Sequence, residues 1–199
     1  MATEDFRFTS SQWHSAIRNE IEIPPDAVIR VLLDPAFTAQ PSSDRSALLA
    51  SYMHSREDGV NELVVLSGKT GRYKGMALAD RTIEFCESVS ANFGKPGLLR
   101  IERIVGVDLL IDTIKFKCEL AGITPPLIDA FAPNCKKGAK NNRIVRIVSL
   151  LGERDALRLR RGPYIEDLME EVEAFVPSKQ NRGRQINLVD CLALSAGFR

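Results

Sequence analysis

Short apolar runs separated by turn residues dominate the first half of the chain. Residues 27–34 are rich in aliphatic and β-branched side chains and end at Pro35, and the runs 45–55 and 62–68 flank the turn sequence EDGVN. Such runs predict strands, and a short turn between two of them predicts an antiparallel pair. A fourth run, 98–106, follows the break GKPG. We therefore expect a sheet whose first three strands form an antiparallel meander.

Helical spacing dominates the second half, with a single helical segment already inserted before the fourth strand. The predicted helices are 76–93, 108–122, 163–177 and 187–198, and the segment 136–154 is predicted to begin as a loop and become a helix. The further predictions are a strand at 126–133 and a short strand or hairpin at 156–162. The helices are recognised by apolar positions that recur three and four residues apart. Strands that first cluster and then alternate with helices indicate an α/β fold, with a mixed central sheet flanked by helices.

Length and composition indicate how many domains the chain forms and where in the cell the protein is expected. The 199 residues, 44% of them hydrophobic, suffice for one substantial core. Residues 1–25 are polar and end in IPPD, so we expect an N-terminal extension or linker followed by a single domain over 26–199. The net charge of +1 indicates that any nucleic-acid binding comes from local patches. Because neither a signal pattern nor a run of about 18 apolar residues is present, we expect an intracellular protein without membrane association.

Three acidic residues interrupt apolar runs and are the candidate site. Asp34, Glu102 and Asp190 stand where an ionised carboxylate costs on the order of several kcal/mol unless it is paired or bound to a cation. If the first and fourth strands are neighbours, the three carboxylates meet over one sheet edge. Hard oxygen ligands suit Mg²⁺ or Mn²⁺. Two such ions about 3.5–4 Å apart would catalyse phosphodiester hydrolysis.

Each acid also fits a simpler explanation. Asp34 could end a strand and begin a turn. Glu102 could pair with Arg100 or Arg103. Asp190 could be an ordinary first-turn acid of a helix capped by Asn187. The residues alone leave these alternatives open.

A basic segment near the expected site is the candidate DNA-binding surface. Its members, which precede or open a predicted helix, are Lys136, Lys137, Lys140, Arg143 and Arg146. Cations there would neutralise phosphates, and the alternative is a solvated helix face. The segment SGKTG at 67–71 is no phosphate-binding loop, because Leu63 stands where that motif needs a glycine.

Six segments together resemble the C-terminal nuclease domain of the large terminase subunit of tailed bacteriophages. They span about residues 26–198 and read LLDPAF, SSDRSALL, LLRIERIVGVDLL, KNNRIVRIVSLL, EDLMEEVEAF and NLVDCLALS. The resemblance implies an RNase H-like fold and a two-metal endonuclease that cuts concatemeric viral double-stranded DNA during genome packaging in the host cytoplasm. It implies Asp34, Glu102 and Asp190 as metal ligands, with Asp44 as a further ligand or neighbour, and supports Lys140 and Arg143 as the basic pair.

The resemblance also implies partners and leaves alternatives. An ATPase domain, the small terminase subunit and the portal would be the partners, and the missing ATPase motor implies a domain fragment or a separate nuclease chain. Many family members carry adjacent acids one turn before Asp190, where this chain has Ile186 and Asn187. We take Asp190 as the third ligand, with Asn187 as the alternative. The alternative functions are a junction resolvase of the same fold and a DNA-binding module that docks the motor without cutting.

Overall fold

The computed structural model describes residues 10–37, 45–132, 139–175 and 186–197. The helices are α1 (Ser10–Ala16), α2 (Met76–Phe93), α3 (Val107–Leu120), α4 (Ala139–Glu153), α5 (Tyr164–Ala174) and α6 (Asn187–Gly197). The strands are β1 (Ile17–Arg18), β2 (Arg30–Asp34), β3 (Ser46–Ser55), β4 (Asn61–Gly71), β5 (Leu98–Glu102), β6 (Leu127–Phe131) and β7 (Leu157–Arg160). None of these helices is both long and apolar enough to cross a bilayer.

The strands of the described residues form one sheet in the order β1-β7-β4-β3-β2-β5-β6. β3 pairs antiparallel with β2 and β4, and the other neighbours are parallel. The predicted meander is therefore present, but the short strand β1 precedes it in the chain and lies at the far edge. The order β4-β3-β2-β5-β6, with parallel strands beside the first strand of the meander, is that of the RNase H-like fold. The predicted fold class is confirmed.

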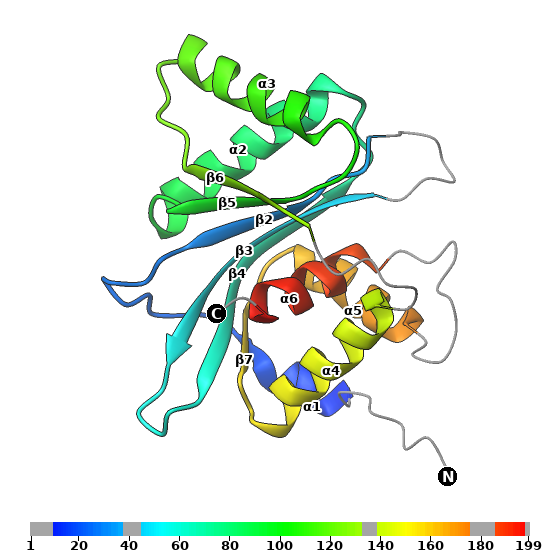
Figure 1. Ribbon diagram of the computed structural model, residues 1–199. Helices are drawn as coiled ribbons and strands as arrows, with labels where there is room; N and C mark the ends of the chain where they lie inside the picture. The colour runs from blue at the N-terminus through cyan, green and yellow to red at the C-terminus, as the bar shows by residue number, and fades with distance from the viewer. Residues whose placement is uncertain (1–9, 38–44, 133–138, 176–185, 198–199) are drawn as a thin grey trace.

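Helices cover both faces of the sheet and create two cores. In Figure 1, α2 and α3 lie on one face, and α1, α4, α5 and α6 lie on the other. Because successive strand residues point to opposite faces, Val31 and Leu33 of β2 join the core under α2 and α3, whereas Leu32 joins the core under α6. Asp34 has the same parity as Leu32, so β2 directs its side chain toward the α6 face.

Part of the segment predicted to be an N-terminal extension packs with the sheet. Trp13 of α1 is 1% exposed, and β1 pairs with β7 through Ile17 and Arg18. The sequence of this polar segment does not predict that it packs, because few of its side chains are buried, chiefly Trp13 and Ala16. The predicted domain start at residue 26 stays a prediction, but residues 10–18 are no free linker.

β4 extends further than the sequence predicted. Residues 69–71, beyond the predicted strand 62–68, continue the strand and pair with β3. A Cβ at Gly68 would lie 3.1 Å from ring atoms of Tyr164 at the start of α5, so the glycine lets the aromatic ring lie on the strand. The segment SGKTG is therefore strand, and its rejection as a phosphate-binding loop is confirmed.

Candidate metal centre

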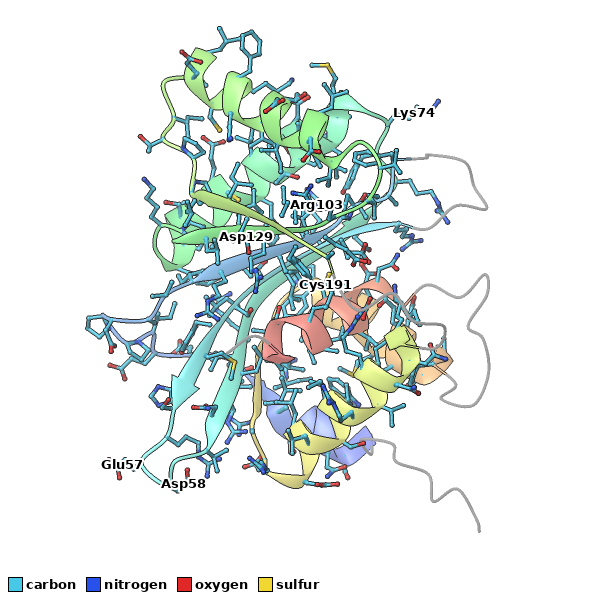
Figure 2. The ribbon with its side chains drawn as sticks, viewed as in Figure 1. Glu57, Asp58, Lys74, Arg103, Asp129 and Cys191 are labelled. Atoms are coloured by element: carbon cyan, nitrogen blue, oxygen red, sulfur yellow. The ribbon has the colours of Figure 1, made fainter. Side chains whose placement is uncertain are left out.

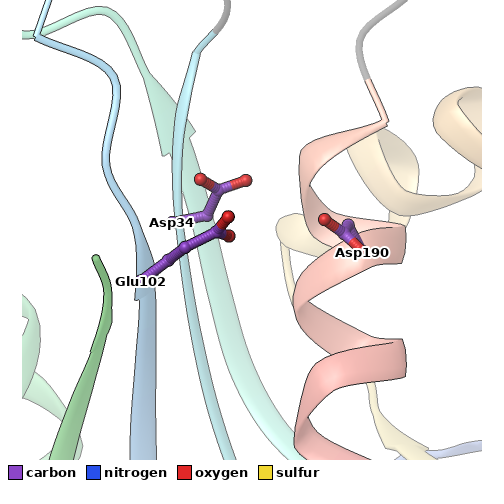
Figure 3. Close-up of side chains that lie close together, drawn as sticks. All are labelled: Asp34, Glu102 and Asp190. Atoms are coloured by element: carbon purple, nitrogen blue, oxygen red, sulfur yellow. The ribbon is translucent and has the colours of Figure 1, made fainter. Parts of the chain in front are cut away.

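Two of the three acids are brought together by strand register. β2 and β5 are adjacent and parallel, and Leu33 lies opposite Ile101 in their ladder. Asp34 and Glu102 are the next residues of the two strands, so their side chains leave the same end of the sheet on the same face. Figure 3 shows them side by side. The predicted neighbourhood of the first and fourth strands of the fold is confirmed.

Asp190 approaches this pair from the opposite layer. It lies in the first turn of α6, and its side chain is 1% exposed. Each of the three acids offers a carboxylate oxygen, and these oxygens lie within 4.8 Å of one another. Figure 3 shows Asp190 across the gap from the strand pair. The structure thus places all three predicted ligands in one cluster, while their binding of a metal stays a prediction.

α6 rests on the meander directly beside the cluster. Residues 187–194 are all buried. The thiol of Cys191, which Figure 2 places between α6 and the sheet, lies 3.8 Å from the carbonyl oxygen of Ala47. Ala47 is the residue opposite Asp34 in the β2–β3 ladder. The helix that carries Asp190 is therefore seated on the same strand pair that carries Asp34.

Two cations from α4 contact the cluster. Arg143 donates to both oxygens of Asp190, with Nη2 at 2.6 Å from Oδ1 and 2.9 Å from Oδ2, and Nε at 3.0 Å from Oδ1. Lys140 Nζ lies 3.1 Å from Asp190 Oδ2 and 3.8 Å from Asp34 Oδ2. Burial alone would lower the pKa of Lys140, but the charges of Asp190 and Asp34 raise it above the usual value. Both predicted basic residues therefore face carboxylates.

Glu102 lies where the charged form of its carboxyl group is disfavoured. Burial and then the charge of Asp190 raise the pKa of Glu102, while Lys140 and Arg143 act in the opposite direction. The simpler explanation for Glu102 was an ion pair with a neighbouring arginine. Arg100 instead contacts Asp129 at 2.9 Å, and Arg103 contacts Asp108 at 3.6 Å. The described ion pairs of both arginines are therefore with acids other than Glu102.

The donor set fits a hard divalent cation. All three groups are carboxylates, the ligand type that Mg²⁺ and Mn²⁺ prefer. Among the residues that the structure describes, and with every group ionised, three carboxylates face the two cations Lys140 and Arg143, which leaves one unit of negative charge. Lys140 lies between Asp34 and Asp190 and is 40% exposed, so its ammonium can withdraw toward solvent. These residues could hold such an ion.

The structure treats the other predicted site residues differently: one is exposed, three lie outside the described residues, and one bonds the main chain. Arg146 is exposed on α4. Asp44, Lys136 and Lys137 lie outside the described residues. Asn187, the alternative ligand, donates from Nδ2 to the carbonyl oxygen of Arg45 at 2.6 Å, so its amide joins α6 to the residue before β3.

Glu171 is a residue of this region that the sequence reasoning missed. It is 6% exposed on α5 and accepts a hydrogen bond from the backbone N–H of Val189 at 3.0 Å. Burial raises the pKa of Glu171, while hydrogen bonds from the α6 backbone act against the rise. The available signal was its position three residues after the buried Leu168, on the apolar face of an amphipathic helix.

Comparisons with known proteins show only distant similarity. No protein-family model matches the sequence, and no curated protein is detectably similar to it. The structure of RuvC from Thermus thermophilus is 13% identical with a TM-score of 0.43, over 85% of this chain and 92% of that one. The fowlpox virus Holliday junction resolvase is 10% identical with a TM-score of 0.41, over 84% and 96%. Similarity at this level says nothing about activity.

Proposed function

We propose that this protein is a divalent-metal-dependent endonuclease that hydrolyses phosphodiester bonds of double-stranded DNA. The observation that carries the proposal is the cluster of Asp34, Glu102 and Asp190, contributed by two adjacent strands and a facing helix, with ligand oxygens within 4.8 Å. Asp190 is buried and the other two acids are partly buried, and a cation in addition to Lys140 and Arg143 would stabilise three carboxylates this close together in their charged form. A site of oxygen ligands at the end of a sheet suits phosphate chemistry.

The residues of the site would have different roles in hydrolysis. Asp34, Glu102 and Asp190 would hold the metal, and bound divalent ions would supply a Lewis acid that activates water and stabilises the leaving oxygen. Arg143 orients Asp190 through its paired hydrogen bonds. Lys140 neutralises Asp34 and Asp190 in the absence of the ion and can turn toward a phosphate once the ion is present.

The finer assignment concerns the DNA substrate. The six segments that resemble terminase nucleases favour cleavage of linear concatemeric DNA during packaging, with Mg²⁺ or Mn²⁺ as the ion. The same carboxylate chemistry serves a junction resolvase equally well. A comparison of linear duplex with a four-way junction of matched sequence separates the two: equal cleavage per strand supports the packaging nuclease, and strong preference for the junction supports the resolvase.

One observation favours a module that binds DNA without cutting. Asp190 already has Arg143 and Lys140 as partners at 2.6 Å and 3.1 Å, so its burial is explained without a metal. In that case metal would change neither DNA integrity nor protein stability. Plasmid cleavage decides between the two functions.

The test uses supercoiled plasmid with Mg²⁺, Mn²⁺ or EDTA. We expect nicking and then linear product with metal, and no cleavage in EDTA. Asp34→Ala should reduce the rate at least about 100-fold, because several kcal/mol of charge stabilisation would be lost. Asp112→Ala, at an exposed position of α3 on the other face of the sheet, is the matched control and should cut like wild type. Metal-independent cutting, or an Asp34→Ala rate equal to wild type, would contradict the proposal.

A further inference from the structure

The N-terminus of α6 is bound by a carboxylate from another helix. Glu171 of α5 accepts a hydrogen bond from the backbone N–H of Val189 at 3.0 Å to Oε2, and the backbone N–H groups of Leu188 and Asn187 also act on its carboxylate and favour its charged form. In Figure 1, α5 and α6 lie against each other on the same face of the sheet. The first residues of a helix have N–H groups without partners inside the helix. Here a buried carboxylate supplies the partner for the N–H of Val189 and lies close to the positive end of α6.

This contact acts on the turn that carries the candidate ligand. Asp190 directly follows Val189, and its own N–H bonds the carbonyl oxygen of Ile186 at 3.1 Å, which closes the first turn. The positive end of the helix dipole also attracts an anion at this end. If the first turn of α6 shifts away from α5, Asp190 shifts with it and changes its position relative to Asp34 and Glu102.

A second contact holds the same turn from the other side. The Asn187 side chain donates to the carbonyl oxygen of Arg45, directly before β3, at 2.6 Å. β3 is the strand that pairs with β2 and thus with Asp34. The first turn of α6 is accordingly fixed both to α5 and to the strand beside Asp34. Of these two contacts, the one to α5 is made by a buried carboxylate, that of Glu171.

We propose that Glu171 is a positioning residue: by docking the first turn of α6 on α5, it sets the place of Asp190 opposite Asp34 and Glu102 and thereby controls divalent-metal affinity. The inference rests on the proposed function, because it concerns the same metal site. Glu171 itself is no ligand in this account, since its described hydrogen bonds go to the α6 backbone. Its effect reaches the ion only through Asp190.

A purely structural role for Glu171 makes a different prediction. If the carboxylate only stabilises the helix, its replacement lowers the melting temperature and leaves the metal affinity of the folded protein unchanged. If it positions Asp190, the affinity of the folded protein falls as well. Metal affinity and thermal stability must therefore be measured on the same samples.

The experiment is isothermal titration of the full chain with MnCl₂, without DNA, for wild type, Glu171→Gln and Glu170→Gln. Glutamine keeps the shape of Glu171 but removes its charge, and Glu170 is the adjacent, exposed acid on α5. We expect the Kd for Mn²⁺ to rise about 10- to 100-fold in Glu171→Gln, the effect of losing a group that orients a ligand. Glu170→Gln should bind like wild type, and circular dichroism and thermal melts report folding.

The outcomes separate this inference from the proposed function. Wild-type binding with an unchanged Kd in folded Glu171→Gln overturns the positioning role alone. Absence of Mn²⁺ binding in wild type overturns the proposed function and this inference with it. Should Glu171→Gln fail to fold, Glu171→Asp keeps the charge but shortens its reach. A folded Glu171→Asp protein with a lower melting temperature but a Kd within about twofold of wild type would overturn the positioning role, because losing a group that orients a ligand typically costs more than that.

Discussion

The two halves of the candidate site are held by different means. Asp34 and Glu102 occupy neighbouring strands, so their separation is set by backbone register and by the strand spacing of about 4.8 Å. Asp190 stands on a helix, and its place depends on side chains: Arg143 on its carboxylate, and Glu171 and Asn187 on its turn. The strand half should therefore tolerate substitution without structural change, and the helix half should not.

Asp190→Asn should have the largest effect on the folded protein. It removes a buried ion-pair partner from Arg143 and Lys140, and breaking such a pair typically costs about 3 kcal/mol or more. Asp34→Asn should cost less than Asp190→Asn, because Asp34 is 16% exposed and its described ion pair with Lys140 is longer, at 3.8 Å. Urea unfolding of both variants in EDTA measures the difference, and equal losses of stability would contradict the division into two halves.

Arg143→Lys should have the next largest effect. Lysine keeps the charge but cannot reproduce the paired contacts of the guanidinium with both Asp190 oxygens. We expect a loss of about 1.5–3 kcal/mol in the free energy of unfolding, the contribution of a hydrogen bond to a charged group. Arg146→Lys, at an exposed position of the same helix, is the control and should not change stability. A stable Arg143→Lys protein would show that Arg143 does not hold the helix half.

Glu102→Gln should separate stability from activity within the strand half. The pKa of Glu102 is raised above 4.5 in the folded state, so the folded protein binds more protons than the unfolded chain as pH rises from about 4.5 through the raised value. Stability of the metal-free wild type must then fall over that window. Glu102→Gln should lack this fall and be more stable than wild type at neutral pH, yet inactive. Unfolding in EDTA between pH 4 and 8 checks this, and parallel pH profiles would contradict it.

Lys140→Gln should have the smallest effect. Its ammonium contacts Asp34 and Asp190, one acid from each half, and would compete with a bound metal for both. Removing one partly exposed cation should raise Mn²⁺ affinity by less than about tenfold, since such pairs are worth about 1 kcal/mol. Titration with MnCl₂ measures the Kd. Weaker binding would show that Lys140 supports the site instead of competing for it.

The strand half could be predicted from the sequence because its geometry is periodic. Asp34 ends an aliphatic run and Glu102 interrupts another, and once the two runs are neighbouring strands, parity places both acids on one face. The neighbourhood itself came from the terminase resemblance, since strand order is not encoded locally. β1 escaped prediction for the same reason: a two-residue strand has no periodicity, and only its pairing with β7 defines it.

The helix half could be predicted only in part. Asp190 was recognised as an acid in a buried helix, but its pairing with Arg143 joins residues 47 positions apart. Glu171 was unrecognisable as a docking residue because its partners are backbone N–H groups of another helix, which carry no side-chain signature. Asn187 was weighed as a ligand, whereas its amide bonds a main-chain carbonyl whose position only the fold provides.

The central claim is that Asp34, Glu102 and Asp190 form one divalent-metal site across the two halves. The most direct measurement is anomalous diffraction from crystals soaked in MnCl₂. We expect manganese peaks in contact with Asp34, with Glu102 and Asp190 completing the site and Lys140 moved away from both aspartates. A soaked crystal with no manganese at these carboxylates, and with Lys140 still between Asp34 and Asp190, would contradict it.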